Sequence, residues 1–496
     1  MGRSTNVTDF LLAAGADEDV ALVEPGGVTT FGQLRHQAGI VSAALRELGL
    51  PRGARVGILG PNSPFWVAGY LATLKLGLVA VPFASVLTAE EIGRNAQTAG
   101  IRAVVVDRRS HRRLAAALPV DLAAITDEVL TSPRVPYWPQ DELTDPDSDA
   151  ALMFTSGTTA GPRAVRVTHR NIMANTSSII EYLDLGATDR TLVILPFSYC
   201  FGASVLHTHL RSGASLALCA SFAFPETAVE LAESTQCTGL AGVPSSFQLL
   251  LRASSFGTRA LPALRTIQQA GGKLPVAQLQ ALMAAQPQAR LFVMYGQTEA
   301  TARLSYLPPE RLADKVGSIG RGIPGVTLTV VDEQGQPVAP GAVGEIVASG
   351  QSISPGYLDD PDATADKFPG GQLRTGDLAT VDDEGFIYVL DRKDDFIKTW
   401  GYRVSSQDIE SAALQMPELV SAAVVGVPDP TAGESVTLFA TVRADAVVSP
   451  RLIQEFLRKR VAKHMVPERV HVVDALPLNA NGKVVKSQLR AWAVAS

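Results

Sequence analysis

The sequence predicts an α/β protein with a large N-terminal domain of doubly wound sheets and a small C-terminal α+β domain. Up to about residue 300, short apolar runs alternate with helical stretches, as in parallel sheets covered by helices. From about residue 326 the pattern changes to short β segments separated by turns. A compact α+β pattern then starts near residue 392, and about a hundred residues suffice for a separate domain. We therefore expect an N-terminal domain over 1–391, with its β-rich subdomain at about 326–391, and a C-terminal domain over 392–496.

The first elements follow from capping residues and apolar runs. Thr30 precedes an expected helix to about residue 48, and Asn62, Ser63 and Pro64 open the next helix with a capping residue and a first-turn proline. Strands are expected at 55–59, 78–81 and 101–106. The longest low-charge run, 64–84, contains Lys75, Gly77 and Pro82, so it predicts a buried helix and a strand, not a membrane span.

The remaining elements lie after an acidic, proline-bearing connector at 138–149. In the large domain, strands are expected at 192–195, 215–218, 239–243, 266–269 and 291–294. In the β-rich subdomain they are expected at 326–332, 344–348 and 386–390. In the C-terminal domain, helices are expected at 406–415 and 451–463, and strands at 422–427, 437–442 and 469–473.

Composition excludes several classes of protein. The chain has 496 residues, more than a single hydrophobic core usually holds, so two or more domains are expected. Its net charge is −6 and it has no basic stripe, which argues against nucleic acid as the main partner. Its cysteines, Cys200, Cys219 and Cys237, are odd in number and lack metal-ligand spacing, so a reducing cytoplasm is expected and a zinc site is not. The N-terminus lacks the pattern of a signal peptide.

A hydroxyl-rich loop between two predicted strands is the first candidate site. Its hydroxyl residues and the glycine among them are Thr155, Ser156, Gly157, Thr158 and Thr159. Arg163 follows a Gly-Pro turn. Such a loop can direct N–H and O–H donors at a polyanion, although the usual Gly-x4-Gly-Lys-Ser/Thr phosphate loop is absent. Taken alone, the loop could equally be a polar hairpin.

Two further motifs contain carboxylates. Tyr295, Thr298 and Glu299 follow an apolar strand, at the edge of a parallel sheet where ligands bind. Tyr295 could stack on a nucleobase, Thr298 could bond a phosphate, and Glu299 could hold Mg²⁺. The alternative is a surface turn with a solvated carboxylate. Asp377, in a Thr-Gly-Asp sequence, suits the hydroxyls of a ribose, although Gly-Asp is also ordinary turn chemistry.

Two motifs lie in the C-terminal part of the chain. The charged segment 391–403 crosses the predicted domain boundary, where a few residues can absorb a backbone rotation; an ordinary charged linker is the alternative. The loop 476–483 presents a single lysine, Lys483, which could act as a point charge for a phosphate or lie on the surface as most lysines do.

In order, spacing and residue type, these five motifs resemble the adenylate-forming superfamily of acyl-CoA synthetases, peptide-synthetase adenylation domains and luciferases. The resemblance extends from about residue 25 to 490 and is closest in type to stand-alone acyl-CoA synthetases. It implies that a carboxylate attacks the α-phosphate of Mg-ATP, giving an acyl-adenylate and pyrophosphate. The thiol of coenzyme A, or of a carrier protein, then takes the acyl group. Positioning and electrostatics should supply most of the catalysis.

The resemblance also implies a role for each motif residue. The residues for the phosphates and Mg²⁺ are Thr155, Ser156, Gly157, Thr158, Thr159, Arg163, Thr298 and Glu299. The residues for the adenosine are Gly271, Gly272, Tyr295, Asp377 and Arg392. Lys483 would bridge the attacking carboxylate and the phosphoryl oxygens, and Arg403 would lie near the phosphates or the interface of the second step.

A rotation of the C-terminal domain is part of the same implication. The domain would pivot near Asp394 and be mobile between two orientations. One orientation would deliver Lys483 for adenylation, and the other would bring the loop of Lys398 and Gly401 to line the thiol tunnel. Such a rotation has a physical reason, because one site must exclude water during two different reactions.

The sequence departs from the family pattern at two places. Ala160 and Arg163 stand where the phosphate loop usually has Gly and Lys, and Arg is the more rigid cation. Tyr199 stands where many acyl-CoA synthetases have the His of an aromatic-His pair, so it could gate the acyl pocket or only pack. We expect structural roles for His169, His207 and His209.

The predicted acyl pocket is apolar, aromatic and small. Its predicted walls are Phe197, Tyr199, Phe201, Gly202, Val243, Pro244, Ser245, Gln269, Ala270 and Met294. No Asp lies between residues 195 and 210 to bind an α-ammonium group, which favours an aliphatic, aryl or polycyclic acid. Lys273 could pair with a second polar group or face solvent.

Several alternatives stay open. An acyl carrier protein could replace coenzyme A as the acceptor, and the chain could be a monomer or a homodimer. It could also be a catalytically silent nucleotide or acyl sensor. An ATP-dependent kinase or synthetase acting at the γ-phosphate would make ADP in place of AMP and pyrophosphate.

Overall fold

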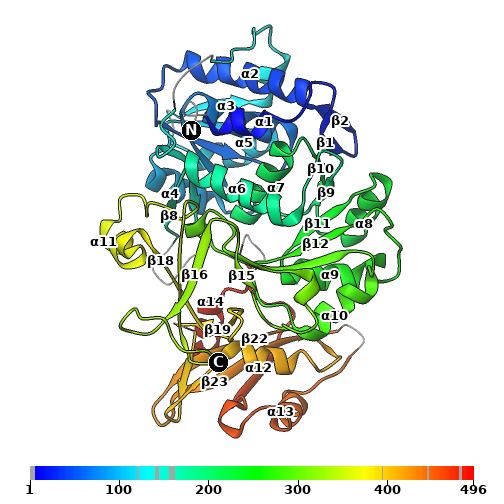
Figure 1. Cartoon of the computed structure of the whole chain (residues 1–496), viewed down its shortest axis with the longest axis vertical. Helices are drawn as coiled ribbons and strands as arrows, with labels where there is room; N and C mark the ends of the chain where they lie inside the picture. The colour runs from blue at the N-terminus through cyan, green and yellow to red at the C-terminus, as the bar shows by residue number, and fades with distance from the viewer. Residues whose placement is uncertain are drawn as a thin grey trace.

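The computed structural model describes residues 6–119, 122–139, 144–155, 162–393, 395–443, 446–479 and 483–495. Its strands form sheets of six, nine and four strands followed by a C-terminal sheet of five. Figure 1 shows the N-terminal elements, blue to green, above the C-terminal sheet, which is orange. The predicted fold class, a large N-terminal α/β domain and a smaller C-terminal domain, is confirmed.

The six-stranded sheet has the order β6-β5-β3-β4-β7-β8. Its strands are β3 (Arg55–Leu59), β4 (Val79–Phe83), β5 (Ala103–Val106), β6 (Ala123–Thr126), β7 (Asp149–Phe154) and β8 (Ala164–Thr168). The helices of this region are α1 (Val7–Leu12), α2 (Phe31–Glu47), α3 (Pro64–Lys75), α4 (Ala89–Ala99) and α5 (Arg108–Leu114). The side chain of Thr30 caps α2, and Ser63 with Pro64 opens α3, as predicted. The antiparallel pair β7–β8 encloses the hydroxyl-rich loop.

The nine-stranded sheet has the order β15-β14-β13-β12-β11-β9-β10-β1-β2. Its strands are β1 (Val20–Glu24), β2 (Gly27–Thr30), β9 (Arg190–Val193), β10 (Ser215–Leu218), β11 (Gly239–Gly242), β12 (Thr266–Gln269), β13 (Arg290–Tyr295), β14 (Ser305–Leu307) and β15 (Arg321–Gly322). Its helices are α6 (His169–Leu183), α7 (Cys200–Arg211), α8 (Pro225–Ser234), α9 (Pro244–Ala253) and α10 (Val276–Ala285). Strands β11, β12 and β13 are parallel and in register, so the loops after them lie at one edge of the sheet.

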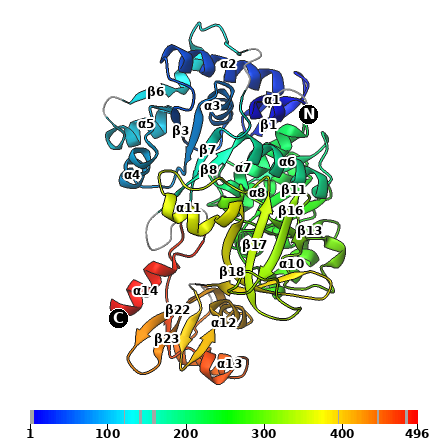
Figure 2. The same ribbon diagram turned by 60° about the vertical axis from the view of Figure 1, so that its left-hand side comes forward.

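The four-stranded sheet is an antiparallel meander. It contains β16 (Val326–Val331), β17 (Gly344–Gly350), β18 (Leu373–Val381) and β19 (Ile387–Arg392), and α11 (Pro361–Lys367) precedes β18. The interpretation of Thr375–Asp377 as a turn was wrong, because these residues lie within β18. Gly376 has a φ of 79°, a conformation that glycine adopts without steric cost, and the strand continues through it. Figure 2 shows α11 beside this sheet.

The C-terminal sheet is covered by helices on both faces. Its strands are β20 (Ile397–Thr399), β21 (Tyr402–Val404), β22 (Leu419–Asp429), β23 (Gly433–Val442) and β24 (Arg469–Val472), and its helices are α12 (Ser406–Ala413), α13 (Pro450–Arg458) and α14 (Lys486–Ala495). Val424 packs in the cluster of α12 and α13, whereas its neighbour Val425 packs with Leu489 of α14. This alternation follows from the period of two in a strand.

Short 3-10 helices complete the chain: η1 (Ala115–Ala117), η2 (Asp127–Thr131), η3 (Ser255–Gly257), η4 (Thr298–Ala300), η5 (Pro309–Arg311), η6 (Pro369–Gly371) and η7 (Lys463–Met465). The run 64–84 forms α3 and β4, as predicted. In the part of the chain that the structure describes, no helix has both the length and the apolar character that a membrane span requires.

Candidate active site

Thr155 and Arg163 close the base of the hydroxyl-rich loop. The N–H of Thr155 donates to the carbonyl of Arg163 (2.9 Å), and the N–H of Arg163 donates to Oγ1 of Thr155 (3.1 Å). The guanidinium of Arg163 donates to Oδ2 of Asp360 (3.1 Å) and lies 5.4 Å from the centre of the Tyr357 ring. The predicted phosphate-binding residues Ser156, Gly157, Thr158 and Thr159, and also Ala160, lie outside the described residues.

Glu299 lies on η4, directly after β13. Its Oε1 accepts a hydrogen bond from the hydroxyl of Tyr357 (2.9 Å), and its carbonyl accepts one from the N–H of Ser354 (2.9 Å). Burial and the charge of Glu299 raise the pKa of Tyr357, so its hydroxyl stays a donor. The hydroxyl of Thr298 donates to Sγ of Cys200 (3.5 Å), which places Thr298 against α7.

A single carboxylate fits the role expected for Mg²⁺. Within the described ranges, no group of three or more His, Cys, Asp or Glu side chains could hold a metal ion without help. Mg²⁺ usually keeps several waters and binds through one or two carboxylates together with the phosphates of its substrate. Glu299, held at one oxygen by Tyr357, matches that limited contribution from the protein.

The carboxylate of Asp377 is held from two sides. The hydroxyl of Tyr295 donates to Oδ2 of Asp377, and Nε of Arg392 lies 3.4 Å from Oδ1. Asp377 and Arg392 are also paired across β18 and β19. Burial, and next the charge of Asp377, raise the pKa of Tyr295 well above its ordinary range, so the phenol remains protonated. The structure thus brings Asp377 and Arg392, expected at the ribose, together with Tyr295, expected at the adenine.

The Gly271-Gly272 turn packs closely against the predicted acyl pocket. Gly271 has a φ of 86°, and a Cβ there would lie 2.9 Å from Val243 and 3.0 Å from the hydroxyl of Tyr199. Nε2 of Gln269 donates to the carbonyl of Gly272 (2.7 Å) and fixes the turn. Only glycine meets both requirements at residue 271.

The predicted walls of the acyl pocket come from α7, α9, β12 and β13 and from the residues that adjoin α7, α9 and β12. Most of them are buried: Phe197, Tyr199, Phe201, Gly202, Val243, Gln269, Ala270 and Met294. Pro244 and Ser245 are partly buried at the start of α9. The rings of Tyr199 and Phe201 meet edge to face at 6.3 Å. A Cβ on Gly202 would lie 2.1 Å from the carbonyl of Pro196, so a glycine is required there.

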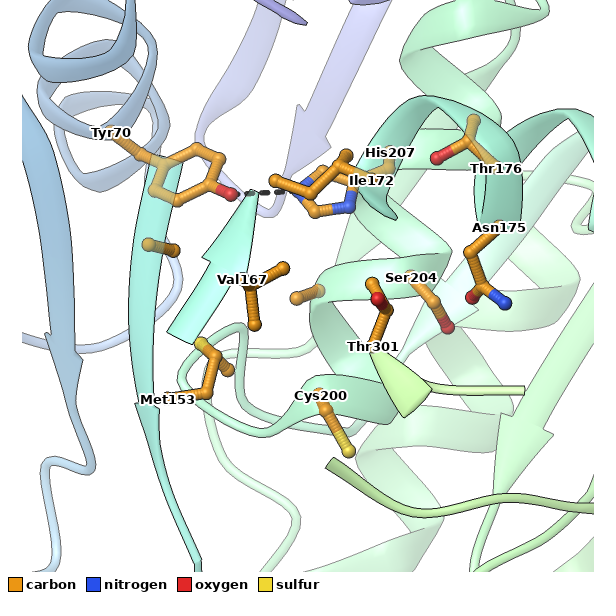
Figure 3. A pocket seen from close by; sticks show the side chains of 12 residues that line it. Tyr70, Met153, Val167, Ile172, Asn175, Thr176, Cys200, Ser204, His207 and Thr301 are labelled. Atoms are coloured by element: carbon orange, nitrogen blue, oxygen red, sulfur yellow. Dashed lines mark hydrogen bonds between the residues drawn. The ribbon is translucent and has the colours of Figure 1, made fainter. Parts of the chain in front are cut away.

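A small cavity lies beside α7, where it is lined by Cys200, Ala203, Ser204 and His207. Figure 3 shows it between Tyr70, Val167, Asn175 and Cys200, with the hydroxyl of Tyr70 directed at His207 (2.9 Å). Its volume of about 20 Å³ has room for roughly one water molecule. None of the predicted acyl-pocket residues lines it, so this cavity is not the predicted acyl pocket.

Lys483 belongs to the C-terminal end of the chain but lies among residues of the N-terminal domain. Burial and the charge of Arg392 lower the pKa of its ammonium group, whereas Cys200, Asp377 and Glu299 raise it. The N–H of Asn479 donates to the carbonyl of Lys483 (2.8 Å). The structure therefore brings together Lys483, Glu299, Asp377 and Arg392, which the sequence analysis drew from separate motifs.

Two family profiles match this chain. A family profile described as "AMP-binding enzyme" matches residues 12–358, and one described as "AMP-binding enzyme C-terminal domain" matches residues 408–483. The chain belongs to the AMP-binding enzyme family. It is an acid–thiol ligase, and the predicted activity is confirmed. With ATP and Mg²⁺ it converts a carboxylic acid to an acyl-adenylate and pyrophosphate, and the acyl group then passes to coenzyme A.

Three relatives illustrate the similarity. A feruloyl-CoA synthase from an Amycolatopsis species is 31% identical over 478 residues and covers 94% of each chain. The fatty acid–[acyl-carrier-protein] ligase ScoC of Streptomyces coeruleorubidus is 28% identical over 482 residues, covering 95% of this chain and 92% of the relative. The solved o-succinylbenzoate CoA synthetase of Bacillus subtilis, in complex with an acyl-adenylate, is 25% identical with a TM-score of 0.87, covering 99% of each chain.

In this AMP-binding enzyme, the segment predicted to act in the thiol step forms a short hairpin. Strands β20 and β21 are joined by Trp400 and Gly401, with φ values of 51° and 78°, as in a two-residue turn with both central residues left-handed. Lys398 is exposed on β20 and pairs in register with Arg403. The expected pivot, Asp394, lies outside the described residues.

The remaining side chains that the sequence analysis singled out have protein partners. Nζ of Lys273 lies 3.9 Å from Oδ1 of Asp408, an ion pair between the two domains. Nδ1 of His169 accepts from the N–H of Val7 (3.2 Å), and Nδ1 of His209 lies 2.8 Å from the carbonyl of Val205. These histidines are buried and packed, as expected.

The sequence analysis missed three polar residues at this family's site. Tyr357 and Asp360 hold Glu299 and Arg163, as described above. Nζ of Lys367 donates to the carbonyl of Thr375 (2.8 Å), and burial lowers its pKa. The Asp360-Pro361 pair predicts a capped helix, α11. The position of that helix beside the site depends on contacts distant in sequence, such as the one between Asp360 and Arg163.

Proposed function

We propose that this enzyme activates a carboxylic acid without an α-amino group and that Lys483 stabilises the transition state of adenylation. The position of Lys483 supports the proposal. Its ammonium lies in the field of Glu299, Asp377 and Arg392, although its loop belongs to the other domain. A cation at this point can bridge the attacking carboxylate and the phosphoryl oxygens, and a contact made only in the transition state raises turnover.

The phosphates are assigned to the β7–β8 loop. Thr155 and Arg163, with residues 156–161 between them, would hold the β- and γ-phosphates. Glu299 would hold Mg²⁺, which supplies neutralisation of the phosphate charge. The hydrogen bond from Tyr357 supports this role, because it fixes one carboxylate oxygen without neutralising the group.

The adenosine is assigned to the edge formed by β12, β13 and β18. Asp377 would accept hydrogen bonds from the ribose hydroxyls, and Tyr295 and Arg392 orient its carboxylate for that task. The Gly271-Gly272 turn would border the adenine, since it exposes backbone where a side chain would obstruct the base.

Thioester formation is assigned to a second orientation of the C-terminal domain. We propose that residues 392–496 rotate as a unit about Asp394, and that the hairpin of Lys398 and Gly401, with Arg403, then replaces Lys483 at the site. The buried carboxylate of Asp391 accepts hydrogen bonds from the N–H and hydroxyl of Ser406, at the start of α12. These bonds span the proposed pivot, so they would hold the C-terminal domain in the orientation that places Lys483 at the site.

The acid is proposed to be aliphatic, aryl or polycyclic. The proposed pocket is built from aromatic and apolar side chains, and Tyr199 stands beside the glycine turn that borders the adenine. Burial keeps the phenol of Tyr199 protonated, so it can gate the pocket as a neutral group.

A carrier protein is the second candidate acceptor, supported by the similarity to ScoC. We propose that the enzyme works in the cytoplasm, where ATP and reduced coenzyme A are available, as a monomer or homodimer.

Pyrophosphate release across a panel of carboxylic acids, with and without coenzyme A, tests the proposal. We expect release that depends on one class of acid, AMP as the nucleotide product, and an acyl-CoA when coenzyme A is added. Lys483→Ala, the control, should bind ATP like the wild type but release no pyrophosphate. Acid-dependent release without a thioester would favour a carrier protein. ADP formation would contradict adenylation, and equal turnover by Lys483→Ala would remove Lys483 from the mechanism.

A further inference from the structure

A fully buried arginine lies beside the proposed acyl pocket and has no part in the adenylation described above. Arg303 lies between η4 and β14, with 1% of its side chain exposed. Its backbone is anchored to α6: Nδ2 of Asn175 donates to the carbonyl of Arg303 (2.9 Å), and the N–H of Arg303 donates to Oδ1 of Asn175 (3.4 Å). The position of the side chain is thus set by the fold.

The guanidinium has few polar contacts. Its Nε donates a long hydrogen bond to the hydroxyl of Tyr182 (3.4 Å), and its Cζ lies 4.1 Å from the centre of the Phe201 ring. Nη2 has no hydrogen-bond partner among the described residues. An arginine offers five N–H donors, so most of its hydrogen-bonding capacity is unused.

The charge of Arg303 is also uncompensated by the protein. Among the ion pairs of the described ranges, none involves Arg303 and a carboxylate. Its positive charge lowers the pKa of Tyr182, Tyr199 and Cys200, which burial raises more strongly. A buried charge without a partner is strongly destabilising, so a fold that keeps one usually supplies the counter-charge from elsewhere.

The surroundings of Arg303 are the proposed walls of the acyl pocket. The ring of Phe201 packs against its guanidinium, and its charge is close enough to Tyr199 to lower the pKa of that phenol. Tyr182, its hydrogen-bond acceptor, donates in turn to Sδ of Met294 (3.1 Å). A group that enters between α7 and β13 to reach Met294 or Phe201 would therefore meet this cation.

We infer that the acid carries a second carboxylate, which pairs with Arg303 while the first is adenylated. The planar fork of a guanidinium accepts a carboxylate in bidentate geometry, and the apolar surroundings strengthen that pairing. The inference rests on the proposed function, since it identifies the class of acid that this pocket takes. It predicts that a dicarboxylic acid is activated and that its monoester, with the far carboxylate blocked, is a poor substrate.

The experiment compares α,ω-dicarboxylic acids and benzenedicarboxylic acids with their monomethyl esters. Wild type, Arg303→Met and Arg303→Lys are assayed for pyrophosphate release, and the melting temperature of each is measured with ATP and each acid. We expect wild type to prefer at least one diacid over its monoester by about 100-fold in kcat/KM. Arg303→Met should remove that preference, and Arg303→Lys should retain part of it. Arg303→Met should also fold, because it replaces an uncompensated charge with an apolar side chain of similar length.

Arg190→Met is the matched control. Arg190 is a partly buried arginine whose hydrogen bonds go to Ser215 (2.9 Å) and to the carbonyl of Thr235 (2.6 Å), remote from the pocket. Its replacement should lower the melting temperature without changing the preference for the diacid. If Arg303→Met lowered turnover of diacid and monoester equally, Arg303 would be a packing residue and the inference would be overturned.

The remaining outcomes separate this inference from the proposed function. Pyrophosphate release with monocarboxylic acids and no preference for diacids would support adenylation and overturn the role of Arg303. A diacid that raises the melting temperature of wild type but not of Arg303→Met, with no pyrophosphate released, would support the anion site and contradict adenylation. If no pyrophosphate were released and the melting shifts of wild type and Arg303→Met were the same, the inference would be overturned.

Discussion

The hydroxyl of Tyr295, at the end of β13, donates a hydrogen bond to Oδ2 of Asp377, within β18. The two residues are 82 positions apart and belong to different sheets. Their contact joins the nine-stranded sheet to the β-rich meander at the site proposed for the ribose. A tyrosine expected to stack on a base therefore has a further role, which is to orient the carboxylate.

Tyr295→Phe tests that role. The variant keeps the ring and removes the hydrogen bond to a charged acceptor, which is typically worth about 1.5 to 3 kcal/mol. We expect KM for ATP to rise roughly tenfold or more, with a smaller change in kcat, in steady-state pyrophosphate release. Tyr306→Phe, the same change on neighbouring β14, is the control and should leave KM unaltered. A wild-type KM for ATP in Tyr295→Phe would mean that Asp377 does not need this hydrogen bond to bind the nucleotide.

Lys483 should give the adenylation rate a descending limb at high pH. Burial, and next the charge of Arg392, lower its pKa from the ordinary 10.5. The cationic form is the proposed catalyst, so activity should fall as pH rises through that lowered pKa, before a free lysine would titrate. Single-turnover adenylation at constant ionic strength measures the limb.

Two variants of Lys483 separate charge from position. Lys483→Arg keeps its charge to higher pH, so any residual activity should lack the descending limb. Lys483→Ala should lose about 100- to 1000-fold in rate at neutral pH, as for other residues that stabilise transition-state charge. An identical high-pH limb in Lys483→Arg would assign the titration to another group.

Arg163 should tolerate lysine better than a neutral residue. Its ion pair with Asp360 is partly exposed, with 37% and 38% of the side chains accessible, so the pair contributes less than about 1 kcal/mol to stability. We expect Arg163→Lys to change KM for ATP by less than about fivefold and Arg163→Gln to raise it about tenfold or more. Equal KM values for the two variants would contradict a role of this charge in phosphate binding.

Most of the fold could be predicted because buried parallel strands are continuous apolar runs. The predicted segments 215–218 and 266–269 coincide with β10 and β12. Strand β18 was missed, since its Gly376 and Asp377 have the composition of a turn. The strand continues there because the N–H of Gly376 bonds Oε1 of Glu345 across the sheet (3.1 Å), a contact that local propensity does not encode.

The site could be predicted only where short motifs mark it. Lys483, Glu299 and Asp377 lie in recognisable patterns, and the structure brings them together. Arg303 carries no such pattern, and arginine is normally a surface residue. Its burial depends on Tyr182, 121 positions away, and on packing over Phe201, so only the folded structure reveals it.

Asp391→Asn should destabilise the domain junction. Oδ2 of this buried carboxylate accepts from the N–H of Ser406 (2.7 Å) and from its hydroxyl (2.9 Å). The asparagine amide is neutral and has a single acceptor oxygen, so we expect these hydrogen bonds to weaken, with a loss of about 2 kcal/mol in the free energy of unfolding, measured with urea. Adenylation, which uses this orientation, should decline more than thioester formation in single-turnover assays. Equal decline in both steps would argue against a role of this junction in the rotation.

His169 should make the protein less stable below neutral pH. Burial, and next the charge of Arg52, lower its pKa from 6.5 to about 4, and its neutral ring accepts the N–H of Val7. In the unfolded chain His169 binds a proton below pH 6.5, whereas in the folded chain it does so only below about pH 4. The contribution of neutral His169 to stability is therefore fully present above pH 6.5 and is lost as the pH falls from 6.5 toward 4. At pH 5 this residue lowers the free energy of unfolding by about 2 kcal/mol.

His169→Asn, whose Oδ1 can accept the same N–H, should reduce the decline in the free energy of unfolding between pH 7 and pH 5, measured with urea, by about that amount. His207, whose pKa burial lowers to about 3, maintains part of the slope. His36→Asn, at an exposed position of α2, is the control. An unchanged slope in His169→Asn would mean that His169 is protonated in the folded protein at pH 5, against the lowered pKa.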